Sequence, residues 1–144
     1  MRFRFIDRIV SFEDGIKSKL VTTKYFPPSD DFIEGHPLQP GEIPTCLILE
    51  TLATSAVRLV YAQSLEKVVG VLLRVEEAKI VSPMHCGEEM KVVTELLGIQ
   101  PESEKSAGLA RTFGQAYVGD REVAEVRLVL LCFPKDGFEG AVPW

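Results

Sequence analysis

Two residues of this chain have the types and spacing to move protons together: His36 and Glu50, fourteen positions apart. His36 stands in a segment rich in glycine and proline, "EGHPLQPGEIP", where a neutral imidazole can remove a proton. Glu50 stands among apolar residues in "TCLILETLATS". Burial there would favour the protonated acid, which can donate a proton. A pair of this kind in an apolar pocket can add or remove water beside a carbonyl group.

Both residues also have a purely structural interpretation. Glu50 could be the partner of Arg58 or of a backbone amide, since a carboxylate inside a helix often serves as one. His36 could simply be exposed in its loop. Composition and spacing alone leave these alternatives open.

One helix and several strands must position this pair. The segment from Pro44 or Thr45 to about Ala62 predicts a long helix, with Pro44 in the first turn or Thr45 as the N-cap. It is apolar nearly all round, which predicts burial on most sides. Apolar stretches and turn residues predict strands at 5–12, 16–25, 68–81, 90–97, 109–117 and 121–133, before an irregular tail. The chain is therefore expected to be one α+β domain, 1–144, with a curved antiparallel sheet around a central helix that a dimer would cover.

Composition excludes several classes of function. The formal net charge of −5 argues against a nucleic-acid surface or a polybasic membrane patch. Cys46, Cys86 and Cys132 form no paired motif, which favours a reduced, cytoplasmic setting. The N-terminus lacks the apolar run of a signal peptide, and no apolar stretch reaches transmembrane length without a charge. His85 stands beside Cys86 in a predicted turn without further ligands, so no metal site is expected.

The segment "GHPLQPGEIPTCLILETLAT" resembles the signature of the 3-hydroxyacyl-[acyl carrier protein] dehydratases, the FabZ/FabA family, which reads approximately GHFPxxPxxPGxxxxE. Gly35, His36, Pro44 and Glu50 match that pattern, and the His-to-Glu spacing is the family's own. The flanks "FRFIDRIVSFEDG", "VEEAKIVSPMHCGEEMKVVTEL" and "GDREVAEVRLVL" are similar to family segments as well. Glutamate rather than aspartate favours the FabZ-like branch.

This resemblance implies a hot-dog fold and the dehydration of (3R)-3-hydroxyacyl thioesters of acyl carrier protein or coenzyme A. The products would be trans-2-enoyl thioesters, in fatty-acid or related lipid or polyketide biosynthesis. His36 would take the C2 proton, and Glu50 would protonate the leaving hydroxyl directly or by positioning a water, with no cofactor or metal. The two residues of one site would come from opposite subunits, which requires a homodimer or a larger assembly of dimers.

The resemblance also implies substrate-binding positions. These are Gly35, Pro44, Thr45, Cys46, Thr54 and Val57. Three of them, Thr45, Thr54 and Val57, depart from the residues usual in the family, as does Pro37-Leu38 after the histidine. These departures shape the loop and the acyl tunnel wall. Two alternatives therefore stay open: a hot-dog thioesterase, in which Glu50 activates water, and a non-catalytic acyl-binding homologue.

Overall fold

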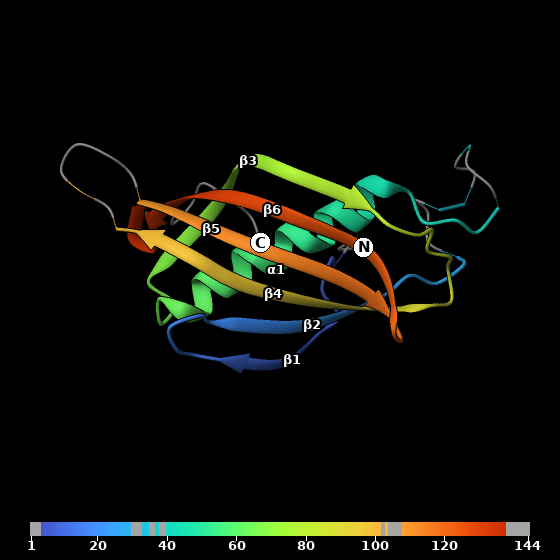
Figure 1. Cartoon of the computed structure of the whole chain (residues 1–144), viewed down its shortest axis with the longest axis horizontal. Helices are drawn as coiled ribbons and strands as arrows, with labels where there is room; N and C mark the ends of the chain where they lie inside the picture. Colours follow the sequence, from blue (N-terminus) through green and yellow to red (C-terminus); the bar gives the residue numbers. More distant parts are fainter. Residues whose placement is uncertain are drawn as a thin grey trace.

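The structure, a computed structural model, describes residues 4–29, 33–34, 37, 40–101, 103 and 108–137. Within them one long helix accompanies six strands and a short 3₁₀ helix (Figure 1). The elements are β1 (Arg8–Glu13), β2 (Lys19–Tyr25), α1 (Thr45–Gln63), β3 (Val68–Ile80), β4 (Glu89–Gln100), β5 (Gly108–Val118), β6 (Arg121–Pro134) and η1 (Lys135–Gly137). The predicted order of two strands, one helix and four strands is confirmed, with boundaries that move by a few residues.

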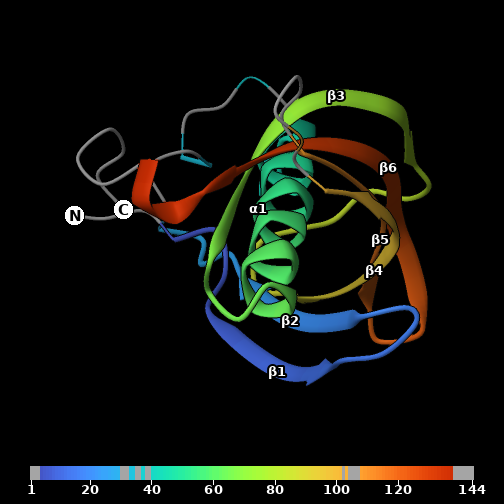
Figure 2. The same ribbon diagram turned by 90° about the vertical axis from the view of Figure 1, so that its left-hand side faces the viewer.

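All six strands form one antiparallel sheet in the order β1-β2-β4-β5-β6-β3. The sheet curves around α1 without closing, so the helix lies inside the curve of the strands (Figure 2). The expected curved sheet around a central helix is therefore confirmed. The order holds one feature that the sequence does not reveal: β3 pairs with β6 and not with β4, its neighbour in the chain. The connection between β3 and β4 must therefore cross over β6 and β5, which lie between the two strands in the sheet.

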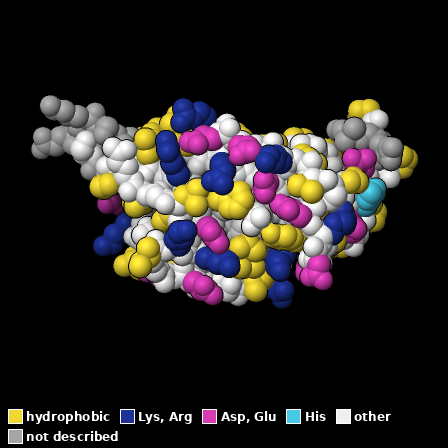
Figure 3. All heavy atoms as spheres, in the orientation of Figure 1, with side chains coloured by type: hydrophobic (Ala, Val, Ile, Leu, Met, Phe, Trp, Pro, Cys, Tyr) yellow, Lys and Arg dark blue, Asp and Glu magenta, His cyan; other side chains and the backbone are white. Residues whose placement is uncertain are grey.

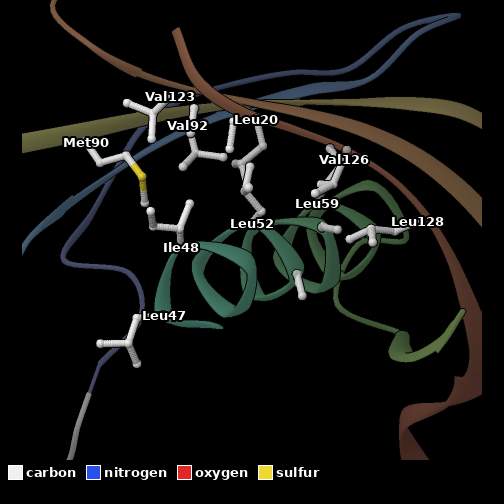
Figure 4. Close-up of a cluster of buried hydrophobic side chains, with 14 of the residues drawn as sticks. Leu20, Leu47, Ile48, Leu52, Leu59, Met90, Val92, Val123, Val126 and Leu128 are labelled. Carbon is white, nitrogen blue, oxygen red and sulfur yellow. The ribbon is translucent and has the colours of Figure 1, made fainter. Parts of the chain in front are cut away.

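α1 packs its apolar residues against the concave face of the sheet. Its buried residues include Ile48, Leu52, Ala56 and Leu59, whose spacing of three and four places them on one side of the helix. Figure 4 shows Ile48 and Leu52 pointing toward side chains of the strands, among them Leu20 and Val92. This packing against the sheet, rather than the helix propensity of its residues, provides most of the stability of α1.

The opposite flank of α1 is less covered than the sequence predicts. The helix is apolar nearly all round, yet Cys46, Glu50 and Arg58 are exposed and Thr54 and Val57 are half-buried. One chain therefore covers most of the helix, as expected, and leaves this flank open.

The start of α1 differs slightly from the expectation. Pro44, rather than Thr45, occupies the N-cap position, with φ −55° and ψ 137°. Its carbonyl oxygen accepts hydrogen bonds from the N–H groups of Leu47 and Ile48, at 3.0 and 3.4 Å. No side chain caps this end, because proline has no side-chain acceptor.

By length and composition α1 is the one helix of the described residues that is apolar enough to cross a membrane, although half of its most apolar stretch is buried inside the structure. On the outer face of the sheet, Lys and Arg side chains alternate with Asp and Glu and with hydrophobic patches (Figure 3). Ion pairs link neighbouring strands, such as Lys79 of β3 with Glu125 of β6 at 3.5 Å and Arg111 of β5 with Glu76 of β3 at 3.6 Å.

Candidate active site

Glu50 lies in the second turn of α1, on the exposed flank of the helix. Among the described residues, no hydrogen bond or ion pair to its carboxylate is found. Arg58, the structural partner that the sequence suggests, instead lies over the ring of Tyr61, 5.6 Å from its centroid. The expected loss of hydration at Glu50 is thus not found in a single chain, but its carboxylate remains free to act on another molecule.

An apolar cavity of about 220 Å³ lies beside this carboxylate. Three elements line it: α1 with Cys46, Leu49, Glu50 and Ala53, β3 with Leu72 and Val75, and β6 with Val126 and Leu128. Val126 and Leu128 belong to the buried cluster drawn in Figure 4 and line the cavity from the sheet. Glu50 is the one charged residue in this lining. The cavity therefore suits an apolar chain whose reactive end lies near a carboxyl group.

The N-terminus of α1 offers a second chemical feature near the cavity. Cys46 lies one turn before Glu50, so both residues are on the same side of the helix. The N–H groups of a first helical turn lack partners within the helix and favour negative charge nearby. The first turn holds no acidic residue that would neutralise this effect. A thioester oxygen that develops negative charge could be held at this position.

The predicted site residues fall into three groups. Gly35 and His36 lie outside the described residues, and so does Leu38. Glu50 and Cys46 line the cavity. The remaining four do not line it: Pro44 is buried, Thr45 is exposed at the helix start, and Thr54 and Val57 are half-buried, with Val57 packed against the core.

Sequence reasoning missed half of the cavity wall. Leu72 and Val75 of β3, and Val126 and Leu128 of β6, were expected only as strand residues. They reach the site because β3 and β6 are paired, with Val75 opposite Leu128. No local pattern announces this pairing, since the two strands are more than forty residues apart in the chain.

Except for Cys46, the other reactive groups of the described residues do not line the cavity. Within the described ranges, no group of three or more His, Cys, Asp or Glu residues is arranged to hold a metal ion. The three cysteines are free, and burial raises the pKa of the Cys132 thiol. His85 is exposed, and its backbone N–H donates to Glu88 at 2.9 Å.

Comparison with solved structures identifies the fold. The chain resembles a Streptococcus mutans protein solved with bound acetyl CoA, with a TM-score of 0.67 and 14% identity over 93% of each chain. It also resembles a hypothetical thioesterase of Streptococcus pneumoniae solved with coenzyme A, with a TM-score of 0.66 and 12% identity over 88% of each chain. A hot-dog-like protein from Thermanaerovibrio acidaminovorans gives 0.63 and 20% identity, over 89% of this chain and 88% of that one. This chain is a hot-dog-fold protein.

Curated relatives point to one group of enzymes within that fold. The chain is 28% identical to the 3-hydroxyacyl-[acyl-carrier-protein] dehydratase FabZ of Chlamydia trachomatis, over 93% of this chain and 85% of the relative. It is 27% identical to the FabZ of Clostridium kluyveri, over 93% and 88%. No family model matches the chain. The resemblance to the FabZ-like dehydratases is confirmed over most of the chain, and the homologues indicate an enzyme of the hot-dog class.

Proposed function

We propose that this protein dehydrates (3R)-3-hydroxyacyl thioesters to trans-2-enoyl thioesters, on acyl carrier protein or coenzyme A. One observation carries the proposal: Glu50, at the position of the family's acidic residue, presents an unpaired carboxylate at an apolar cavity. Relatives named as FabZ dehydratases support the same chemistry. The acyl chain would lie along Leu72, Val75 and Leu128, with its thioester near the start of α1. The proposed setting is cytoplasmic, and the proposed pathway is that of fatty acids or a related lipid.

The proposed proton transfers use His36 and Glu50. His36 removes a proton from C2, and the carbanion is stabilised as an enolate whose oxygen faces the N–H groups at the start of α1. Glu50 donates a proton to the 3-hydroxyl, which leaves as water while the C2–C3 double bond forms. The reaction consumes no external oxidant or reductant. Both groups return to their starting state when the proton gained by His36 passes back to Glu50 through solvent.

The proposed working unit is a homodimer formed through β3. This strand is at one of the two edges of the sheet, the other being β1, and ten successive residues from Val71 to Ile80 are exposed. They include Leu73, which is 55% exposed, and several further hydrophobic residues. A long edge strand that exposes several hydrophobic residues is prone to pair with another strand. A second copy paired there would also cover the Glu50 flank of α1, because both border the same cavity. It would thereby supply the dry surroundings that one chain lacks.

A thioesterase is the second candidate function, since solved neighbours of this fold carry that name. In that reaction Glu50 would activate water, which attacks the thioester carbonyl and releases a free thiol. The segment with Gly35 and His36 favours dehydration, because hydrolysis does not need a base at C2.

The identity of the product separates these functions. Purified protein is incubated with a 3-hydroxyacyl coenzyme A and with the corresponding acyl carrier protein thioester. Absorbance at the enoyl thioester band and free thiol are then followed in parallel. Enoyl product without free thiol is the expected result. Free thiol without enoyl product would establish a thioesterase, and neither product with measurable substrate binding would establish an acyl-binding protein.

A further inference from the structure

The connection between β3 and β4 is hydrogen-bonded to residues 41–43, which directly precede the start of α1. Residues 82–88 of this connection are called the crossover segment below. The N–H of Ile43 donates to the carbonyl of Met84 at 2.8 Å, and the N–H of Cys86 donates to the carbonyl of Gly41 at 2.7 Å. Glu42 and His85 form the bridge between them. Residues 41–43 are thus paired to the crossover segment immediately before α1 begins.

Arg121, the first residue of β6, fastens the crossover segment from outside. One terminal nitrogen, Nη1, donates to the Ser82 hydroxyl at 3.1 Å and to the carbonyl of Pro83. The other, Nη2, donates to both carboxylate oxygens of Glu88, at 3.0 and 3.1 Å. Arg121 therefore binds the first two residues and the last residue of the segment with a single planar group.

Glu88 completes this clamp from within the segment. Its Oε2 accepts a hydrogen bond from the N–H of His85 at 2.9 Å, next to the residues that pair with 41–43. The Ser82 hydroxyl also donates to the carbonyl of Glu122 at 2.6 Å, which ties the segment to β6 a second time. The crossover segment is therefore held on β6 on one side and holds residues 41–43 on the other.

We propose that Arg121 and Glu88 are positioning residues for proton transfer at Glu50. This inference rests on the proposed dehydratase function. The chain that joins His36 to Glu50 passes through residues 41–43, so their backbone fixes where that chain enters α1. Neither clamp residue touches the cavity. Each acts through the crossover segment, and a misplacement of about 1 Å can lower a catalysed rate by up to about 100-fold.

The exposure of the pair supports a local role over a global one. The side chains of Arg121 and Glu88 are 39% and 32% exposed, and exposed ion pairs add little to the free energy of unfolding. The hydrogen bonds of these two residues are nevertheless concentrated in the crossover segment, which is only seven residues long. A guanidinium also has a fixed planar geometry that a lysine ammonium cannot reproduce. Arg121→Lys should therefore keep the attraction to Glu88 but lose part of the link to Ser82 and Pro83.

The test combines amide hydrogen exchange with steady-state kinetics. Arg121→Gln should speed exchange at the amides of Ile43 and Cys86 by about tenfold and lower kcat by about tenfold, with KM nearly unchanged. Arg121→Lys should give intermediate values in both measurements. Arg8→Gln removes another exposed arginine, on β1 at the opposite edge of the sheet, and should change neither.

Each measurement can overturn the inference. Unchanged exchange at Ile43 and Cys86 in Arg121→Gln would show that the clamp does not hold residues 41–43. Faster exchange with wild-type kcat would show that the clamp is only structural. A wild-type protein that produces no enoyl thioester would overturn the proposed function itself, and with it the catalytic role of the clamp. That result is recognised before any variant is made.

Discussion

Glu50 of α1 and Val75 of β3 line the same cavity, so the candidate proton donor lies beside the β3 edge of the sheet. In the proposed function, this arrangement links catalysis to assembly. The strand that is proposed to pair with a second copy also forms one wall of the candidate site. A change at the edge of β3 should therefore alter the enzyme even where it leaves Glu50 in place.

A charge on the β3 edge should disrupt both assembly and activity. In Leu73→Lys, a charged group would have to be desolvated at the β3 interface, so we expect a larger monomer fraction and a kcat at least about tenfold lower. Sedimentation velocity and the dehydration assay measure the two effects. Leu97→Lys is the matched control, because Leu97 is a comparably exposed leucine on β4, away from the β3 edge. A wild-type protein that is monomeric at micromolar concentration and fully active would contradict the dimeric site.

The close approach of α1 to the sheet depends on Gly114 in β5. A Cβ at this position would lie 3.3 Å from Leu52 Cδ2 and 3.4 Å from Val126 Cγ2. Gly114→Val should therefore lower the free energy of unfolding by about 1–3 kcal/mol through overpacking. Gly98→Val on β4 meets nothing within 4 Å and should be nearly neutral. Chemical denaturation of both variants measures the difference, and equal losses would show that packing against Leu52 is not the cause.

Acid should weaken the clamp at the crossover segment. The N–H of His85 is the main cause that lowers the pKa of Glu88 from its ordinary value of 4.5. Burial opposes this effect, and the charge and hydrogen bond of Arg121 lower the pKa further. A carboxyl group with a lowered pKa binds fewer protons in the folded state, so its stabilising effect is complete above pH 4.5 and disappears as the pH falls through the folded value. Glu88→Gln should thus melt at most a few degrees below wild type at pH 7. The two should melt together in strong acid. A gap in melting temperature that is unchanged at pH 2 would contradict this cause.

The sequence predicts where the helix and the strands lie in the chain better than it predicts which strands pair in the sheet. The helix from Thr45 and the six strands follow from local apolar patterns and from turn residues such as those of "EDG" and "VGD". The place of β3 depends instead on pairing with β6, to which no local signal points. The sequence consequently predicts only that Leu72 and Val75 belong to a strand, whereas the structure shows that they line the cavity.

The candidate site is predicted only in part, because the sequence does not show which surfaces pack together. Glu50 was expected to be buried because its helix is apolar nearly all round, but its flank faces the β3 edge and is exposed in one chain. A hydrophobic pattern indicates that the surface of a helix is apolar. It does not indicate which sides of the helix are covered by the sheet of the same chain. The role of His36, which lies outside the described residues, stays a prediction from its spacing to Glu50.

The central claim is that Glu50 donates a proton to the leaving hydroxyl, and Glu50→Gln tests it most directly. Glutamine keeps the size of the side chain but cannot supply the proton. The exposed carboxylate has no partner among the described residues, so the fold should be intact. We expect the rate of enoyl thioester formation to fall by about 100-fold or more, the usual effect of a lost general acid. Glu89→Gln, which alters an exposed carboxylate at the start of β4, should keep the wild-type rate. Wild-type dehydration by Glu50→Gln would contradict the claim.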